Sequence, residues 1–318
     1  MIKKLLPLLM MTSLLLTACA PVTAPDDSGD GDEVSLSIVA TTYPLYLFAS
    51  EVTRGVEGAT VSLLVNQDLS CLHDYTLTVQ DMKLLEQADV LIINGAGLDD
   101  FVADTLGALP QGGNPILVNC SQGVQLLTAA EEHDHDHDHD GDHDHGDIDP
   151  HYWMDPALAT TAVETIAASL IKLQPEAETA YRSNAEAAVL ALQSARDAMQ
   201  TRLEPLTARE LITFHDGFQY FAQAFDFVIL LSIEEEEGRE ASAKVIAEAA
   251  TLISGYGLPA IFTEVNSSDA TAQAIARETG ATVYPLSMIM SGPTETPGLQ
   301  PYLDAMNENV TTVLEALQ

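Results

Sequence analysis

The chain has 318 residues, and 12 Lys and Arg stand against 48 Asp and Glu, which gives a formal net charge of −36 at pH 7. Because 47% of the residues are hydrophobic, the chain is not a disordered polyelectrolyte, and its length allows one large or two medium domains with real cores. The acid excess argues against nucleic acid as a partner, since phosphate binding needs clustered Lys and Arg. It favours a cationic ligand.

Residues 1–18 are typical of a secretory signal peptide. Lys3 and Lys4 precede an apolar run that is too short for a stable membrane span, and small residues follow it. The end of this segment resembles a bacterial lipobox, which implies that Cys19 becomes the lipidated first residue of the mature protein. The alternative is an ordinary cleaved signal with an accidental Cys. Residues 19–33 read as a flexible tether, so we expect an exported protein, lipid-anchored to the bacterial cell membrane and facing the periplasm or the cell exterior.

Short apolar, β-rich runs alternate with helical patterns after the tether. Near-continuous apolar strands separated by helices are typical of parallel βα units buried on both faces. The pattern occurs twice, so the sequence predicts an α/β fold with two lobes, residues 34–174 and 205–318, each a parallel sheet flanked by helices. The predicted strands cover residues 36–40, 60–65, 90–94, 116–119, 211–214, 227–231, 260–263 and 282–286, with helices near 45–54 and 78–88.

A long helical stretch lies between the predicted lobes. Apolar residues keep helical spacing from Leu158 to Leu170 and again from Ala185 to Leu203. The second set predicts a connecting helix over 175–204, about 38 Å long at the usual helical rise. We expect this helix to run along both lobes as a rigid spine that limits their opening.

Residues 131–147 form a low-complexity loop of alternating His and Asp. The loop has no hydrophobic residue to pack between His133 and His145, so we expect it to be mobile. Imidazole and carboxylate bind borderline divalent metals, which makes the loop a candidate metal collector rather than a merely solvated polar loop. Its six His residues are His133, His135, His137, His139, His143 and His145.

Three His remain outside this loop: His73, His151 and His215. His73 follows the second predicted strand, His151 lies in the long connection after the fourth, and His215 comes directly after the fifth. Ligands of open parallel α/β sheets bind outside the carboxyl ends of the strands, so the three side chains can converge on one cleft between the lobes. Three neutral imidazoles and one further oxygen suit Zn²⁺.

Six segments of the chain carry a family resemblance: Ala40 to Pro44, Leu72 to Tyr75, Asn94-Gly95, Asp149 to Pro156, Phe214 to Phe218 and Ile261 to Glu264. Together they resemble the zinc/manganese solute-binding lipoproteins of bacterial ABC importers. The similarity covers nearly the whole mature chain. It implies two α/β lobes joined by a rigid helix, a metal in the cleft between them, and delivery of that metal to a membrane permease. A His-rich loop in this place belongs mostly to zinc-specific members of the family.

The resemblance implies that His73, His151 and His215 are three of the metal ligands. Manganese-type members commonly carry a carboxylate where His215 stands, so a third imidazole favours Zn²⁺ over Mn²⁺. Many relatives have an Asp ligand where this chain has Ser287, and a Ser hydroxyl is a poor zinc ligand. Glu264 is the nearest carboxylate, and it either binds the metal directly or hydrogen-bonds a His, with water as the competing fourth ligand.

Other acidic and sulfur-containing residues are secondary candidates. Asp74 and Asp155 follow ligand His residues and are candidate hydrogen-bond acceptors for them, with surface exposure as the alternative. Cys71 and Cys120 could form a disulfide in an oxidising compartment or stay two separately buried thiols. Cys71 does not show the spacing of a zinc-binding thiolate.

Function classes other than an import receptor are open at this point. Three His with an open position also occur in zinc hydrolases, where Glu264 could act as general base, but the chain lacks a His-Glu-x-x-His signature. A surface adhesin or metal-storage lipoprotein is another alternative, with the His/Asp loop as its working part. We expect a monomeric zinc receptor that is not an enzyme, with an ABC permease and a divalent metal ion as partners.

Overall fold

The computed structural model describes residues 35–65, 72, 75–106, 115–128, 148–233, 241–265, 267–295 and 297–318. Residues 35–318 form one compact unit. The expectations for the signal peptide, Cys19 and the tether lie outside the described residues. So do those for Cys71, His73, Asp74 and the loop 131–147.

The N-terminal lobe is a parallel sheet of four strands. Its strands are β1 (Leu36–Ala40), β2 (Ala59–Leu63), β3 (Val90–Ile93) and β4 (Ile116–Asn119), in the order β2-β1-β3-β4. Three helices connect them in chain order: α1 (Tyr43–Val52), α2 (Val79–Glu86) and α3 (Asp100–Leu106). The change of direction in the strand order falls between β1 and β3, which is where ligands bind in sheets of this kind.

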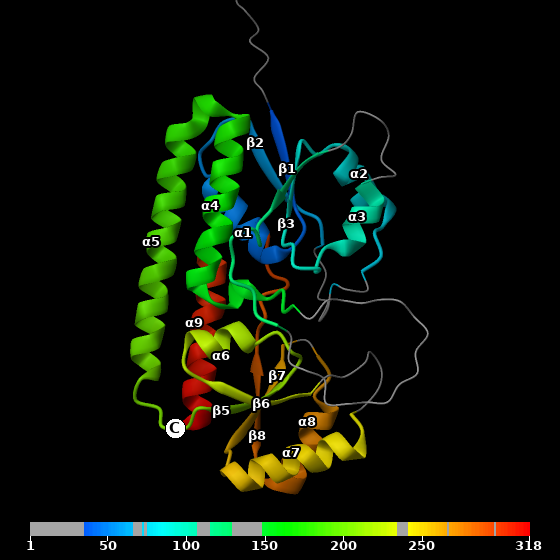
Figure 1. The fold of residues 1–318 in the computed structure, drawn as a ribbon, viewed down its shortest axis with the longest axis vertical. Coiled ribbons are helices and arrows are strands. Elements are labelled where there is room, and N and C mark those ends of the chain that lie inside the picture. Colours follow the sequence, from blue (N-terminus) through cyan, green and yellow to red (C-terminus); the bar gives the residue numbers. More distant parts are fainter. Residues whose placement is uncertain are drawn as a thin grey trace, which may run out of the picture. The chain divides into compact units, whose positions relative to one another are not determined.

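The C-terminal lobe repeats this arrangement (Figure 1). Its order is β6-β5-β7-β8, again with parallel pairs, so β5 and β7 flank the corresponding change of direction. The strands are β5 (Glu210–Phe214), β6 (Val228–Ile233), β7 (Ala260–Glu264) and β8 (Thr282–Leu286), and the helices are α6 (Gln219–Ala224), α7 (Ala243–Tyr256) and α8 (Ala270–Thr279).

Three long helices lie beside the two sheets. Helix α4 (Pro156–Leu173) leads through a 3-10 turn at Pro175–Ala177 into α5 (Glu178–Leu203), which has 26 residues, and α9 (Gln300–Leu317) closes the chain. Helix α5 packs on α4 and contacts both α1 of the first lobe and the C-terminal α9. Figure 1 shows α5 running alongside both sheets, which confirms the predicted course of the long helix along both lobes.

Local sequence signals explain where these helices begin. Pro156 opens α4, and Asp155 caps it by accepting a hydrogen bond from Ala157 N at 2.8 Å. Thr78 and Asp81 form a reciprocal capping box at the start of α2. Because each cap satisfies an otherwise unpaired backbone N–H, these residues set where α2 and α4 begin.

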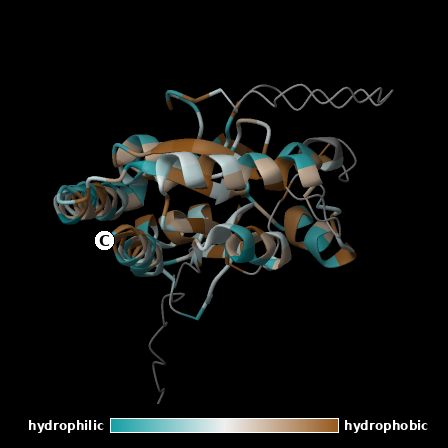
Figure 2. Ribbon diagram, turned by 90° about the horizontal axis from the view of Figure 1, so that it is seen from below, coloured by the Kyte–Doolittle hydropathy of each residue, from teal (hydrophilic) through white to brown (hydrophobic). Residues whose placement is uncertain are grey.

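The main hydrophobic core runs through both lobes. One cluster of buried side chains joins Ile38 and Val90 of the first sheet to Leu211 and Phe262 of the second, and a smaller cluster around Ile261 completes the C-terminal lobe. Figure 2 shows hydrophilic and hydrophobic residues on the same helices around the sheets, as amphipathic helices require. The two lobes therefore share the larger of the two hydrophobic clusters.

Helix α4 is, among the described residues, long and apolar enough to cross a membrane. In this fold it is a core helix, since Ala162, Val163 and Ile166 are fully buried and the helix packs on α1 and α5.

The sequence-based predictions of the elements agree with the structure. All eight strands occur, with ends shifted by one or two residues, and α1, α2, α4 and α5 cover the predicted helical segments. The terminal helix α9 had not been predicted. Cys120 is a free, buried thiol, whereas Cys71 lies outside the described residues.

Candidate metal site

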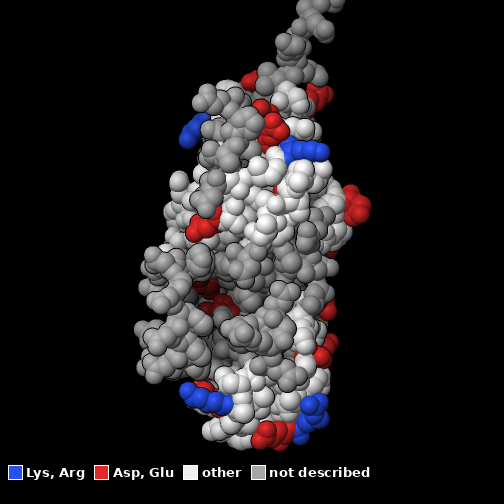
Figure 3. Space-filling model, turned by 90° about the vertical axis from the view of Figure 1, so that its right-hand side faces the viewer, with Lys and Arg blue, Asp and Glu red and all other residues white. Residues whose placement is uncertain are grey.

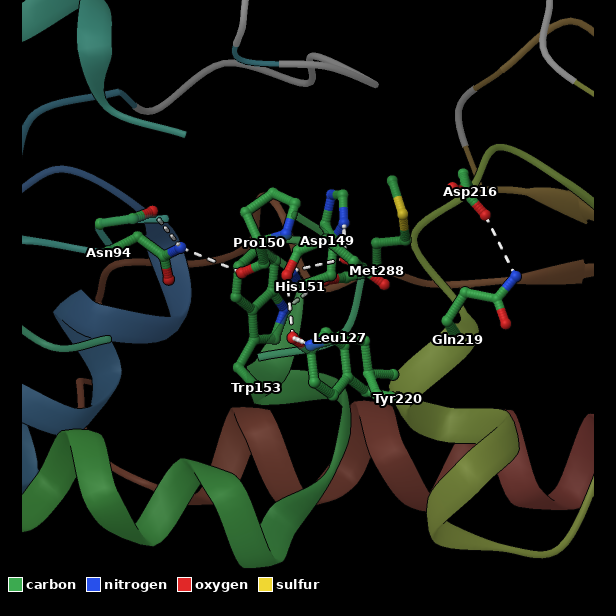
Figure 4. Close-up of polar contacts among 11 residues, drawn as sticks. Asn94, Leu127, Asp149, Pro150, His151, Trp153, Asp216, Gln219, Tyr220 and Met288 are labelled. Carbon is green, nitrogen blue, oxygen red and sulfur yellow. Dashed lines mark hydrogen bonds and ion pairs between the residues drawn. The ribbon is translucent and has the colours of Figure 1, made fainter. Parts of the chain in front are cut away.

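His151 lies at the end of the segment that enters α4 from the first lobe. It comes two residues after Asp149 and directly before the 3-10 turn Tyr152–Met154. Asp149 Oδ1 accepts hydrogen bonds from His151 N at 2.9 Å and from the ring Nδ1 at 2.8 Å (Figure 4). A carboxylate can only accept, so Nδ1 carries the proton and Nε2 keeps its lone pair for a metal.

His215 lies directly after β5, as the strand pattern predicted. Its φ is 72°, in the left-handed region that residues with a Cβ rarely adopt, and its backbone N donates to Ile233 O of the neighbouring strand at 3.0 Å. This unusual backbone turns the chain sharply at the carboxyl end of the sheet. Strained residues of this kind cluster at binding sites.

The structure brings His151 and His215 together from different lobes. Their ring centroids are 5.4 Å apart and the ring planes are nearly perpendicular, at 89°. Trp153 also packs against the His151 ring, edge to face, with 5.2 Å between the ring centroids. His151 is buried and His215 half-buried, so the pair lies in a partly desolvated setting where imidazole nitrogens can bind a metal.

Buried hydrogen bonds hold the backbone on which His151 lies. Asn94 Nδ2 donates to Pro150 O at 3.0 Å, and Tyr152 Oη donates to Asn94 O at 3.2 Å. From the second lobe, Tyr220 Oη donates to Asp149 O at 2.9 Å and accepts from Leu127 N at 2.8 Å. The position of His151 is therefore fixed by contacts from both lobes.

Glu264 is the last residue of β7 and only 6% exposed. Burial raises the pKa of its carboxyl group to about 8, and a hydrogen bond from Ser267 opposes that shift. In the described part of the chain, no three His, Cys, Asp or Glu side chains form a group that could hold a metal. Glu264 is therefore not assembled with the His pair into such a group, and its role as a ligand stays a prediction.

Ser287, which follows β8 directly, takes part in hydrogen bonds through both its backbone and its side chain. Asn309 of α9 accepts from Ser287 N at 2.8 Å and donates to Ser287 O at 2.7 Å. The Ser287 hydroxyl accepts from Ile289 N at 3.0 Å. The side chain thus shapes the turn after β8, as Ser side chains commonly do in loops.

One cavity of the N-terminal lobe lies apart from the His pair. It has a volume of about 200 Å³ and is lined by residues of β3, α3, β4 and the loop between β3 and α3, including Gly95, Asp99 and Leu117. Burial raises the pKa of Asp99 to about 7, although its Oδ2 accepts from Gly95 N at 2.7 Å. Of the predicted ligands that the structure describes, namely His151, His215 and Glu264, none lines this cavity.

Sequence reasoning missed the residue that orients His151. Asp155 was the candidate acceptor, but in the structure it caps α4 and accepts from Arg196 Nε at 3.1 Å. Asp149 takes the acceptor role instead. Its position two residues before His151 was the available signal, because an Asp side chain readily bonds to the backbone N–H two residues on.

Acidic side chains occur along the face shown in Figure 3. Lys and Arg lie near the two ends of this face, whereas Asp and Glu also lie in the hollow near its middle. Together with the net charge of −36, this distribution favours the approach of cations.

Comparison with known proteins gives a consistent assignment. The family model described as zinc-uptake complex component A, periplasmic, matches residues 38–316. The high-affinity zinc uptake system protein ZnuA of Bacillus subtilis (strain 168) is 29% identical over 306 residues, which cover 96% of this chain and 94% of that protein. The zinc-binding protein AdcA of Streptococcus pyogenes serotype M6 is 28% identical over 295 residues, which cover 88% of this chain but only 56% of AdcA.

A solved structure shows the same architecture. A mutant of the laminin-binding adhesin Lmb of Streptococcus agalactiae superposes with a TM-score of 0.74 at 23% identity, covering 89% of this chain and all of that one. Two parallel sheets, a long helix beside both and a His pair between them define a solute-binding protein of the metal-receptor type of ABC importers. The chain belongs to the zinc-uptake complex component A family.

Proposed function

We propose that this protein captures Zn²⁺ outside the cytoplasm and delivers it to an ABC permease. The observation that carries the proposal is the meeting of His151 and His215, one from each lobe, with 5.4 Å between their ring centroids. The family assignment and the likeness to ZnuA of Bacillus subtilis support zinc as the transported metal. Members of this family are components of uptake systems, and the protein acts by binding and release.

The proposed ligand set is His73, His151 and His215, with Glu264 as the candidate oxygen contact. Three imidazoles suit a borderline metal such as Zn²⁺, whereas Mn²⁺ prefers carboxylate and water. Asp149 fixes the tautomer of His151, so that Nε2 is free to bind the ion. Glu264 takes part either directly or by hydrogen-bonding a water or a His.

The proposal also includes a lipid anchor, a monomeric state, and roles for the acidic surface and the His/Asp loop. Lipidation of Cys19 ties the receptor to the membrane beside its permease, and the protein works as a monomer. The acidic surface raises the local cation concentration, and the His/Asp loop 131–147 collects metal near the tight site. Because neutral imidazole binds the ion, protons compete with it, and affinity falls as the pH drops through about 6.5.

Adhesion is the second function that the family members suggest. The likeness to the laminin-binding adhesin concerns the fold alone, at 23% identity, so it adds no argument for adhesion by this chain. The paired His residues are explained by metal capture without an adhesive role.

A zinc titration tests the proposal. The soluble chain from Glu33, with residues 131–147 deleted, is titrated with Zn²⁺ and with Mn²⁺ in competition with a chelator. We expect one tight zinc site per chain, much weaker for Mn²⁺, that is lost in His215→Ala and in His151→Ala. Absence of a tight site in the loop-deleted chain would mean that the loop, and not the His pair, carries the metal binding.

A further inference from the structure

Met288 reaches the His pair from the turn after β8. A Cβ placed on Gly217 would overlap Met288 Sδ, and the same Cβ would lie 3.2 Å from His215 Nδ1 and 3.4 Å from His151 Cδ2. The thioether sulfur therefore fills the space that glycine at position 217 leaves, and atoms of both His rings lie at the edge of that space. In Figure 4 the Met288 side chain extends next to the His151 ring.

The backbone that carries Met288 is held firmly. Trp153 Nε1 donates to Met288 O at 2.9 Å, and Trp153 is the residue that packs against the His151 ring. The preceding Ser287 is fixed at both its N–H and its carbonyl by Asn309. Met288 is 1% exposed, so its side chain is packed in place and does not point to solvent.

The residue after Met288 has an unfavourable backbone conformation. Ile289 has φ of 61°, which is a genuine outlier for a β-branched residue, and it is buried. A turn that keeps such a conformation must be stabilised by its surroundings, here by the Asn309 and Ser287 hydrogen bonds. This strain and these contacts together place the Met288 side chain beside the His rings.

A thioether differs chemically from the carboxylate or water that would otherwise border the site. Sulfur is soft and polarisable, it carries no charge, and it bonds weakly to hard cations such as Mn²⁺. Soft and borderline ions gain from a sulfur neighbour, and Cu(I) and its analogue Ag⁺ gain most.

We propose that Met288 is a specificity-determining residue of the metal site, whose thioether borders the ion held by His151 and His215 and selects soft and borderline metals against Mn²⁺. The inference rests on the proposed function, since it concerns the same site. It extends that function, because it predicts that the receptor also binds monovalent soft cations.

The test measures the affinity of the full mature chain and its variants for three metal ions. Zn²⁺, Mn²⁺ and Ag⁺ are titrated separately in competition with chelators, at fixed pH and ionic strength. Met288→Leu removes the sulfur with little change of volume, and such swaps usually leave cores folded. Met288→Asp supplies a hard oxygen in its place.

We expect Met288→Leu to weaken Ag⁺ binding at least roughly tenfold while the protein stays folded by circular dichroism. We expect Met288→Asp to shift the Zn²⁺/Mn²⁺ affinity ratio toward Mn²⁺ by a similar factor. As an independent steric probe, Gly217→Ala displaces Met288 Sδ without changing the sulfur, and it should reproduce the loss of Ag⁺ affinity.

The outcomes separate this inference from the proposed function. If wild type binds Zn²⁺ tightly but Met288→Leu changes Ag⁺ affinity less than twofold and Met288→Asp leaves the Zn²⁺/Mn²⁺ ratio unchanged, the role of Met288 is wrong and the receptor function stands. If wild type has no tight zinc site, the proposed function itself fails. If His151→Ala and Met288→Leu each lower the Ag⁺ affinity, both side chains belong to one site.

Discussion

Asp149 accepts two hydrogen bonds from His151 through a single oxygen, one from the backbone N–H at 2.9 Å and one from the ring Nδ1 at 2.8 Å. The two bonds fix the ring relative to its own backbone and define which nitrogen faces the site. Asp149 is 2% exposed, so water cannot replace this contact. The residue is therefore a positioning residue for the proposed metal site.

Removing the Asp149 carboxylate should weaken zinc binding. We expect Asp149→Ala to lower zinc affinity by about 10- to 100-fold, because His151 loses the acceptor that sets its tautomer and orientation. Asp149→Asn keeps an acceptor oxygen and should lose less. Chelator competition measures both. As a matched control, Asp155→Ala removes the α4 cap and the Arg196 contact, so it should lower the melting temperature without changing zinc affinity. Equal affinities of all three variants would contradict the positioning role.

Tyr220→Phe should destabilise the fold across the lobes. The Tyr220 hydroxyl lies between Leu127 N and Asp149 O, and its removal leaves both backbone groups without this partner. We expect the free energy of unfolding to fall by about 1–3 kcal/mol, measured by urea unfolding. Tyr256→Phe is the control, since Tyr256 is 57% exposed and should change stability by less than about 0.5 kcal/mol.

Glu264 should make the stability of the metal-free protein depend on pH. Its pKa is about 8 in the folded state against an ordinary 4.5, so the folded state keeps a proton that the unfolded state releases between these values. Stability is therefore complete below about pH 4.5 and declines as the pH rises toward 8. Glu264→Gln cannot ionise, so its stability relative to wild type should increase by a few kcal/mol from pH 5 to pH 8. A difference that stays constant over this range would show that Glu264 is already ionised at neutral pH.

Asn309→Leu tests the support of the turn after β8. The side-chain oxygen and nitrogen of Asn309 both bond to the backbone of Ser287, and the residue is 2% exposed. Leucine would leave two buried backbone groups unpaired, so we expect a loss of about 1–3 kcal/mol in the free energy of unfolding. Asn307→Leu, on the exposed side of the same helix, is the control and should cost much less. If Asn307→Leu lowered the free energy of unfolding and Asn309→Leu did not, the support of this turn by Asn309 would be contradicted.

The same turn shows where sequence patterns stop being informative. The family resemblance drew attention to Ser287 as a possible departure from an Asp ligand. Nothing in the sequence indicates that its hydroxyl bonds to Ile289 N or that Asn309, 22 residues away, holds its backbone. Those contacts depend on the packing of α9 against β8, and α9 was not predicted.

The sequence by itself determined the strand order in the chain, the α/β class, the long connecting helix and the candidate ligand His residues, because periodicity and strand ends are local properties of the chain. The position of His215 directly after β5 follows from that local pattern. Only the tertiary structure decided that His215 meets His151, that Asp149 and not Asp155 orients the ring, and that Met288 borders both. These contacts join segments up to about 140 residues apart in the chain, and the shared core, with α5 packed along both lobes, brings those segments together.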